Sequence, residues 1–355
     1  MKERALIPIL LLLAASCNRV ENPVAETAGI GFDAGVTLLR EDGTKASTLV
    51  TATSFEDGDV IRVFGRRVGE GKNTRIFGTS GVDVTYDASE NAWTYSPSAY
   101  WYWVSAANYY DFLAAWPADG AVRMVDEFDE DIPGNLAIRK PYSIDVDDYD
   151  LLLAGTRRRG IDADTRTNPV PLEFRHMLSA VRVHVTNESD ARALTLNSIH
   201  LDNLIHSASA KVTVDAEGFP EFSWIDTERK TDEFPLFTEG YALAVSASYK
   251  PSGYELLIPA DLSDTIDGSL EADDDKVPGL IVRFTPDGGE ETKKRVPLKD
   301  IQKSRYGNDD PISEWEPGIK YTYNVIIRLD GGVLVTVVTT EWEDIEAETP
   351  GLLIE

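Results

Sequence analysis

Cysteine is almost absent from this sequence, because Cys17 is the only one among its 355 residues. A single thiol cannot form an intramolecular disulfide or a thiolate metal site. Histidine is scarce too, and the four histidines are not arranged with serine, cysteine or acidic partners in a recognisable catalytic order. We therefore predict a protein that is stabilised by apolar cores, carries no metal or cofactor, and is not an enzyme.

Positive charge is in deficit, and the chain carries a formal net charge of −27 at pH 7. Such a surface repels phosphate backbones and anionic lipid headgroups, which argues against nucleic acid as a partner and against electrostatic membrane docking. Long apolar runs are also missing after residue 16, where no segment approaches the ~20 residues that a membrane-spanning helix needs. A hydrophobic content of 42% nevertheless predicts a folded body.

The amino terminus has the layout of a secretory signal, with a charged head, an apolar run over residues 5–15 and small residues before Cys17. The apolar run is too short to span a bilayer, so we predict that residues 1–16 are a removable signal peptide. A conventional cut after Ser16 fits almost equally well, but residues 13–17 resemble the lipobox of bacterial lipoproteins. That resemblance implies cleavage before Cys17 and a membrane anchor of lipid on its sulfur. The alternative is that Cys17 is an incidental thiol.

Residues 17–28 are polar and aperiodic, so we predict a tether between the lipid and the fold. The rest of the chain is dominated by short runs rich in Val, Ile, Tyr, Phe and Thr that Gly, Asp, Asn or Pro interrupts. Several runs alternate apolar and polar residues, as a strand with one buried face requires. Examples are residues 59–64, 180–185, 280–284, 321–327 and 333–338.

No long segment shows a helical period, whereas a βαβ fold would need helical crossovers between its strands. We therefore predict an all-β fold made of sandwiches. The polar stretch 157–171 separates two strand-rich halves. This pattern predicts one domain at residues 29–165 and a second at residues 166–355.

Three kinds of side chain are candidates for binding sites. Acidic clusters at residues 145–150 and 273–275 offer the oxygen ligands that Ca²⁺ prefers, but neither fits an EF-hand loop and we interpret both as solvated loops. His176 has no cysteine or second histidine at ligand spacing, so we interpret it as a core or rim histidine. Four tryptophans offer either a platform on which sugars stack or ordinary core packing: Trp93, Trp101, Trp103 and Trp116.

Four stretches of the chain carry a resemblance to a known family. They are residues 57–61, residues 93–117 with their tryptophans, residues 172–181, and residues 315–323 leading to 333–338 and Trp342. In the last of them, Pro317 and Gly318 have the chemistry of a tight turn into a hairpin. With the lipobox, these stretches make the sequence similar to the fimbrillin family of the Bacteroidetes, the type V pilins and their Mfa1-like relatives.

The resemblance implies two tandem transthyretin-like β-sandwich domains and export to the outer membrane as a lipoprotein. It also implies a fimbrial subunit or accessory protein that contributes to adhesion. Its partners would be other pilus subunits joined by strand exchange, together with a ligand on a host or bacterial surface. The alternative is a surface lipoprotein that binds glycans and does not polymerise.

In such strand exchange, a protease removes the lipidated first strand and a strand from another subunit fills the groove. Residues 30–32 and 36–39 can form that strand here, and Arg40 precedes a turn that a trypsin-like protease could reach. Arg62, Arg66 and Arg67 are alternative sites, and Arg40 could equally be a surface residue of a hairpin. The tail after Trp342 is acidic and a poor donor strand, which favours a tip, accessory or anchor role over the stalk.

Overall fold

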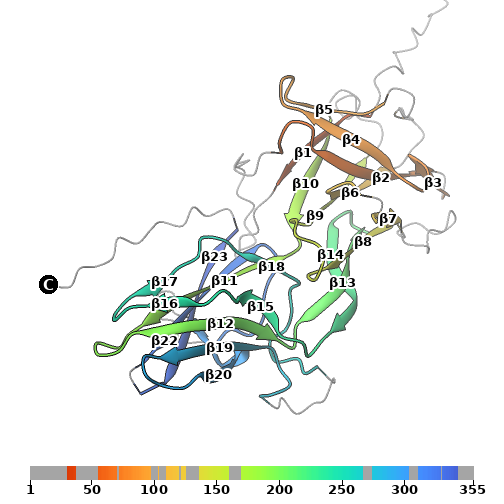
Figure 1. Ribbon diagram of the computed structural model, residues 1–355. Helices are drawn as coiled ribbons and strands as arrows, with labels where there is room; N and C mark the ends of the chain where they lie inside the picture. The colour runs from red at the N-terminus through yellow and green to blue at the C-terminus, as the bar shows by residue number, and fades with distance from the viewer. Residues whose placement is uncertain are drawn as a thin grey trace, which may run out of the picture.

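The computed structural model shows a chain built almost entirely of strands, so the predicted all-β class is confirmed (Figure 1). The helical structure among the described residues is a single 3₁₀ turn, η2 (Leu298–Asp300). None of these residues belongs to a helix that is long and apolar enough to cross a membrane. The structure describes residues 30–36, 55–69, 72–96, 103, 109–119, 121–124, 136–159, 169–266, 274–303, 311–328 and 330–342.

The first sheet has eight strands in the order β1-β10-β9-β6-β2-β4-β5, with β3 paired to β2. Its edge strands β1 and β5 contact each other, so the sheet curves around an aromatic core. We call it the curved sheet. Neighbouring strands are antiparallel except β1, which runs parallel to β10. The strands are β1 (Phe32–Val36), β2 (Val60–Gly69), β3 (Lys72–Ile76), β4 (Val82–Asp87), β5 (Ala92–Thr94), β6 (Tyr109–Trp116), β9 (Leu152–Arg159) and β10 (Val170–His176).

A four-stranded sheet in the order β14-β13-β8-β7 packs on the other face of the curved sheet. Alternation along β2 explains how the curved sheet serves two cores. Ile61 and Val63 belong to the aromatic core, whereas Phe64 belongs to the core shared with Ile138 and Val212 of the four-stranded sheet. The strands of this sheet are β7 (Arg123–Met124), β8 (Ala137–Ser143), β13 (Ile205–Val214) and β14 (Pro220–Arg229).

Two further sheets face each other at the lower left of Figure 1 and enclose the rest of the apolar core. One has the order β17-β11-β22-β23-β21 with β18 paired to β11, and the other has the order β15-β12-β19-β20 with β16 paired to β12. Their strands are β11 (Ser179–Asn187), β12 (Leu194–Asp202), β15 (Phe234–Phe237), β16 (Tyr241–Leu243), β17 (Ser248–Tyr249), β18 (Glu255–Leu257), β19 (Gly279–Pro286), β20 (Thr292–Pro297), β21 (Gln302–Lys303), β22 (Ile319–Ile327) and β23 (Val333–Glu341).

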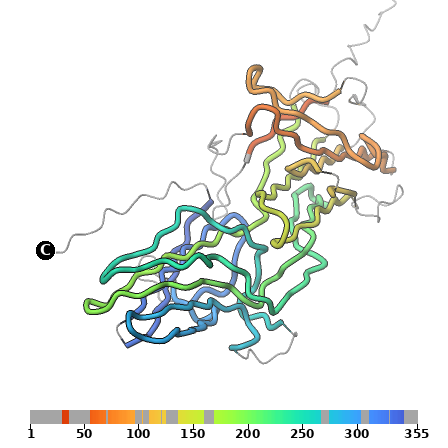
Figure 2. The backbone as a smooth tube through the Cα atoms, in the orientation of Figure 1, coloured from red at the N-terminus to blue at the C-terminus, as the bar shows by residue number. Residues whose placement is uncertain are grey.

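The chain crosses between the two pairs of sheets more than once (Figure 2). Strands β11 and β12 belong to the second pair, β13 and β14 return to the first, and β15 onward belongs to the second again. Strand β10 also lies in the curved sheet, so strands on both sides of residues 165 and 166 share a sheet. The division into domains 29–165 and 166–355 stays a prediction about folding units, but the sheets themselves do not separate there. Pairing between strands that are distant in sequence decides which sheet each strand joins. A local alternation with a period of two does not indicate that pairing.

Candidate functional site

Strand β1 is an edge strand that pairs with one neighbour. It runs parallel to β10 in a register that places Phe32 opposite Val170 and Gly35 opposite Glu173. None of the described strands pairs with the other edge of β1. Parallel pairing is slightly less stable per residue than antiparallel pairing, and five residues form few ladder bonds. The backbone therefore holds β1 more weakly than it holds the central strands.

Side chains from β1 complete the aromatic core. Phe32 is only 4% exposed, and its ring centroid lies 5.6 Å from that of Phe112, 5.9 Å from Tyr95 and 6.0 Å from Phe77. Ile30, just before the strand, is buried as well. Burying a Phe side chain stabilises a fold by about 1.5–3 kcal/mol, so this ring anchors the strand. A chain that lost β1 would expose an apolar groove beside β10.

The proposed cleavage sites are distributed unequally over the chain. Cys17 and Arg40 lie outside the described residues. Arg62, Arg66 and Arg67 all lie within β2, which pairs with β3, β4 and β6. Proteases cut most readily at exposed loop tips, and a strand paired on both sides is not such a site. The sheet therefore protects the three alternatives to Arg40.

Two of the four tryptophans proposed as a sugar platform are turned into the core. Trp93 is buried against Phe55 and Tyr86, with ring centroids 4.8 and 5.1 Å away. Trp103 is buried against Tyr110 at 4.8 Å. Both rings thus have the packing role that was the alternative to sugar binding. Trp116 is half-buried at the end of β6, and Trp101 lies outside the described residues.

His176 lies at the end of β10, where the chain passes toward the second pair of sheets. Its Nδ1 is 2.5 Å from Oδ2 of Asp150, and its ring stacks on Trp342 at 4.6 Å with an interplanar angle of 18°. The backbone N–H of Trp342 donates to Gly318, whose own N–H donates to Leu178. Two of the four stretches that carried the family resemblance, residues 172–181 and the stretch from residue 315 to Trp342, therefore meet here. His176 is buried with the partners expected of a rim histidine.

The aromatic motif before β22 is organised by hydrogen bonds between its own side chains. Trp315 donates from Nε1 to the hydroxyl of Tyr323 at 2.8 Å, and the backbone N–H of Glu316 donates to the hydroxyl of Tyr321 at 2.7 Å. Both tyrosines are buried, and burial raises the pKa of each hydroxyl above its usual value. Buried polar tips need such partners, so this motif stabilises the turn into β22.

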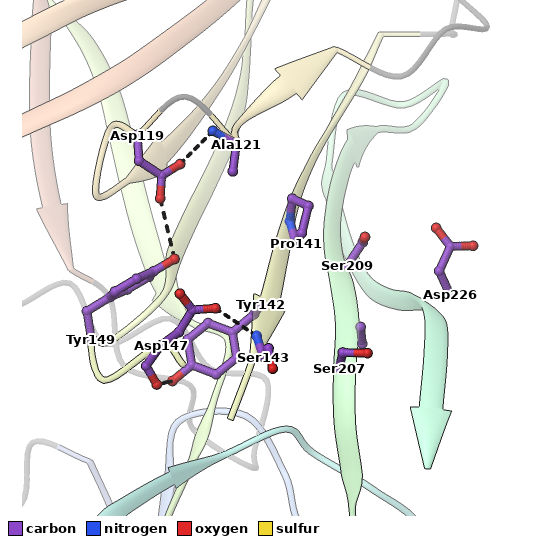
Figure 3. Close-up of a pocket in the computed structure, with 11 residues that line it drawn as sticks. Asp119, Ala121, Pro141, Tyr142, Ser143, Asp147, Tyr149, Ser207, Ser209 and Asp226 are labelled. Carbon is purple, nitrogen blue, oxygen red and sulfur yellow. Dashed lines mark hydrogen bonds between the residues drawn. The ribbon is translucent and has the colours of Figure 1, made fainter. Parts of the chain in front are cut away.

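A pocket of about 340 Å³ opens between β8, β13 and the loops that flank β8 (Figure 3). Tyr149 donates to Asp119 at 3.4 Å, and the backbone N–H of Ser143 donates to Asp147 at 2.7 Å. Its lining comes from segments far apart in sequence, so no local pattern indicated it. Its polar lining comprises Asp119, Ser143, Asp147, Ser207, Ser209 and Asp226, and Tyr142 and Tyr149 add aromatic surface.

Lys140 lies behind this pocket with a fully buried side chain. Its ammonium donates to the carbonyl oxygen of Pro117 at 2.6 Å and forms an ion pair with Asp119 at 2.9 Å. It also lies 4.7 Å from the ring centroid of Tyr149. Burial lowers the pKa of Lys140 below its usual value, although Asp119 opposes the shift. Lys140 thus fixes Asp119 and Tyr149 at the pocket wall.

The acidic residues near position 145 are engaged with side chains and backbone of the protein. Asp145 lies 2.9 Å from Nδ1 of His206 and forms an ion pair with Lys230 at 2.6 Å, and Asp150 contacts His176. The described part of the chain contains no group of three or more His, Cys, Asp or Glu residues placed to hold a metal ion. Of the second cluster, Asp274 and Asp275 are described and Asp273 is not.

A buried cluster of two arginines and one aspartate lies between the curved sheet and the turn that joins β13 to β14. Asp111 accepts bonds from Arg66 Nε at 2.8 Å and from Arg157 Nε at 2.7 Å, and the side chains of Arg66 and Asp111 are 0% exposed. Arg157 also donates to the carbonyl oxygen of Ala216 at 2.7 Å. Burial lowers the pKa of Arg157, but its bonds to Asp111 more than offset this and raise it overall. Sequence reasoning missed the cluster, because its members come from β2, β6 and β9.

Comparisons with known proteins match most of this chain. A family model described as Fimbrillin-like matches residues 44–342. A search of curated proteins finds no match. A solved structure of a candidate cell adhesion protein from Bacteroides uniformis is 19% identical, with a TM-score of 0.44, and the match covers 88% of this chain and 98% of that one.

Two further solved structures are similar. A candidate cell adhesion protein from Parabacteroides distasonis is 9% identical with a TM-score of 0.48, and the match covers 81% of this chain and 94% of that one. The fimbrial anchor protein Mfa2 from Porphyromonas gingivalis is 12% identical with a TM-score of 0.37, and the match covers 88% of this chain and 97% of that one.

Proposed function

Because this chain belongs to the fimbrillin-like family, we propose that it is a subunit or accessory component of a cell-surface fimbrium and contributes to adhesion. Its work is assembly and attachment, not catalysis. The family match extends over residues 44–342 and so includes every described strand of the four sheets except β1. Export follows the amino-terminal signal, and lipid on Cys17 attaches the protein to the outer membrane.

The position of β1 is the observation that carries the assembly mechanism. Of the described strands, only β10 pairs with β1, and the anchor Phe32 fills a place in the aromatic core. Arg40 follows β1 in sequence, so a cut after Arg40 would separate residues 17–40 from the rest of the fold. Loss of that segment would leave β10 with an unpaired edge beside an apolar groove. A strand from another subunit then adds to β10, with its backbone supplying ladder bonds and its side chains supplying specificity.

Controlled proteolysis tests this mechanism. Purified protein that begins at Cys17 is treated with an arginine-specific protease and examined by mass spectrometry and by SDS gel electrophoresis without heating. We expect a new amino terminus at Glu41 and oligomers that resist SDS. Arg40→Gln removes both results, whereas the matched control Arg67→Gln, in β2, leaves both unchanged.

Two results would contradict the proposal. A protein that is cut after Arg40 but stays monomeric would show that release of β1 does not lead to assembly. A cell-surface form that begins only at acylated Cys17 would show that the cut is not made in the cell, while leaving the lipid anchor intact.

The pocket of Figure 3 favours a second candidate function, the binding of a glycan by a lipoprotein that does not polymerise. Carboxylates and hydroxyls around an aromatic side chain are suited to hold a sugar. A glycan array with the intact protein tests this function. Binding that is lost in Ser209→Val, but retained in Trp116→Phe, would support a sugar site in the pocket and would argue against a sugar site at Trp116, the half-buried member of the tryptophan set.

A further inference from the structure

The pocket of Figure 3 contains one carboxylate that has no ion-pair partner among the described residues. The carboxylates of its lining belong to Asp119, Asp147 and Asp226. Lys140 pairs with Asp119 at 2.9 Å, and Arg139 pairs with Asp226 at 3.4 Å. Asp147 is half-buried, and no described lysine, arginine or histidine lies within ion-pair distance of it. The pocket therefore contains more anions than cations.

The neighbouring cations do not remove this excess negative charge. The ammonium of Lys140 acts on Asp147 as well as on Asp119, but it carries one charge and these two carboxylates carry two. Arg62 also acts on Asp119, but its guanidinium is paired with Asp83 at 2.7 Å. Each neighbouring cation thus has a carboxylate of its own, and the charge of Asp147 remains. The pocket attracts a cationic ligand and repels an anionic one.

Two tyrosine rings lie beside this carboxylate (Figure 3). Tyr142 and Tyr149 pack edge to face, with ring centroids 5.6 Å apart and an interplanar angle of 89°. Burial raises the pKa of both hydroxyls, and the charge of Asp147 raises both pKa values further. Asp147 is therefore close enough to act on both side chains. An aromatic wall next to an anion suits a ligand that has C–H groups and a positive charge.

A buried hydroxyl in the same pocket also has no hydrogen-bond partner among the described residues. Ser209 on β13 lines the pocket and is only 8% exposed. The hydroxyl of Ser207, two residues earlier, donates to Glu228 at 3.0 Å, whereas that of Ser209 bonds to no described group. Most buried polar atoms of side chains are hydrogen-bonded, so the Ser209 hydroxyl is available to a ligand in the pocket.

From this geometry we propose that the pocket binds a hexosamine whose amino group is free, with its ammonium on Asp147 and one of its hydroxyls on Ser209. The inference rests on the second candidate function, glycan binding at this pocket. An ammonium group offers three donors and forms charge-assisted hydrogen bonds with a carboxylate. A sugar hydroxyl also satisfies Ser209, which a simple alkyl amine does not.

The size of the pocket and the arrangement of its carboxylates narrow the ligand class. A volume of about 340 Å³ lies at the small end of the range for ligand pockets, which suits one sugar unit and not a long segment of polymer. No group of three or more His, Cys, Asp or Glu residues in the described part of the chain is placed to hold a metal ion. The carboxylates therefore suit an organic cation better than Ca²⁺, which takes about 6–8 oxygen ligands.

Calorimetric titration of the full chain with D-glucosamine, D-glucose and propylamine tests the proposal at mildly acidic pH, where the amines are protonated. We expect saturable binding of glucosamine that is at least about tenfold tighter than that of glucose, because glucose lacks the positive charge. Propylamine should also bind more weakly than glucosamine, because it lacks the hydroxyl groups.

The outcomes separate this inference from glycan binding in general. Equal binding of glucosamine and glucose would overturn recognition of the ammonium group, but would leave sugar binding at the pocket intact. Equal binding of glucosamine and propylamine would overturn recognition of the sugar. Absence of binding by all three would overturn the inference, and the glycan array then decides separately whether the protein binds a larger glycan.

Two variants of the same loop locate the ammonium group. Asp147→Asn removes the charge but keeps an oxygen that accepts the backbone N–H of Ser143, and it should weaken glucosamine binding by about tenfold or more. The control Asp148→Asn removes the same charge one residue further on, at an exposed position outside the pocket lining, and should bind glucosamine as the wild type does. Equal glucosamine binding by Asp147→Asn and the wild type would also overturn the proposal.

Discussion

The hydroxyl of Tyr95 donates a 2.6 Å hydrogen bond to the carbonyl oxygen of Ile30, and so ties the residue after β5 to the residues that lead into β1. The same tyrosine ring lies 5.9 Å from the ring of Phe32. These contacts join the two edges of the curved sheet on the side where the described strands form no ladder. Strand β1 is thus held by backbone on one edge and by side chains on the other.

Removal of the Tyr95 hydroxyl should loosen β1 without disturbing the sheet. A hydrogen bond of this kind contributes about 1 kcal/mol, so Tyr95→Phe should speed hydrogen exchange of the β1 amides by about fivefold. Tyr86→Phe is the control, because the Tyr86 hydroxyl donates a 2.8 Å hydrogen bond to Oδ1 of Asn91 at an exposed position. Equal exchange of the β1 amides in both variants would show that the Tyr95 bond does not hold the strand.

Truncation of Phe32, the side chain that anchors β1, should destabilise the fold. Phe32→Ala leaves a cavity in the aromatic core, and we expect the free energy of unfolding to fall by about 3–5 kcal/mol in urea denaturation. Phe219→Ala is the control, since this ring is 64% exposed and its loss should change stability by less than about 0.5 kcal/mol. A small effect of Phe32→Ala would mean that β1 contributes little to the native fold.

The stability of the buried cluster of Arg66, Asp111 and Arg157 should depend on the carboxylate of Asp111. Asp111→Asn removes the counter-charge that Arg66 and Arg157 share, and we expect a loss of about 3–5 kcal/mol in the free energy of unfolding. Asp83→Asn breaks the more exposed pair with Arg62 and should cost less than about 1 kcal/mol. Losses of equal size in the two variants would contradict the claim that burial sets the difference.

His200 should make stability fall on mild acidification. Burial, together with Arg283 and Lys293, lowers the pKa of His200 below its usual 6.5, although Glu233 opposes the shift. Arg283 donates to Nδ1 of the neutral ring at 3.1 Å. As pH falls, His200 therefore binds a proton in the unfolded chain before it does so in the folded chain. The contribution of neutral His200 to stability is present above pH 6.5 and is lost as pH falls below it. His200→Gln should flatten the decline in the urea midpoint between pH 7 and pH 5; an unchanged decline would exclude His200 as its source.

Glu233 should affect the stability of the fold at lower pH than His200 does. Its hydrogen bonds to Arg283 and Lys293 lower its pKa from 4.5 to about 2. The folded state therefore stabilises the ionised form of Glu233. The contribution of this carboxylate to folding stability is present above pH 4.5 and is lost as pH falls toward 2. Glu233→Gln should remove this part of the acid dependence and steepen the part due to His200. Urea midpoints from pH 7 to pH 2 measure both, and an unchanged profile below pH 4.5 would contradict the role of Glu233.

Local patterns predicted the strands well. Alternation of apolar and polar residues placed strands at residues 180–185, 280–284, 321–327 and 333–338, and β11, β19, β22 and β23 include these ranges. A period of two is a local property of a half-buried strand, so the sequence contains it in full. The family resemblance rested on the same kind of information, because turn and aromatic residues recur at short spacings.

The pairing of strands lay outside such patterns. Alternation along β10 and β13 does not indicate that β10 pairs with β9 or that β13 pairs with β8, because contacts between segments far apart in the chain decide the pairing. The candidate sites share this property. Arg66, Asp111 and Arg157 come from three strands, and their sequence spacing carries no signal of the shared carboxylate.

The sequence by itself therefore determined the all-β class, the turns and the strand character of the individual runs, since each depends on residues close to one another in the chain. Only the tertiary structure decided which strands became edges, which tryptophans were buried and which charges were shared. Strand β1 shows the difference most clearly. Its composition predicts a strand, but its place beside β10, with Phe32 in the core and Tyr95 on Ile30, depends on segments that meet only after folding.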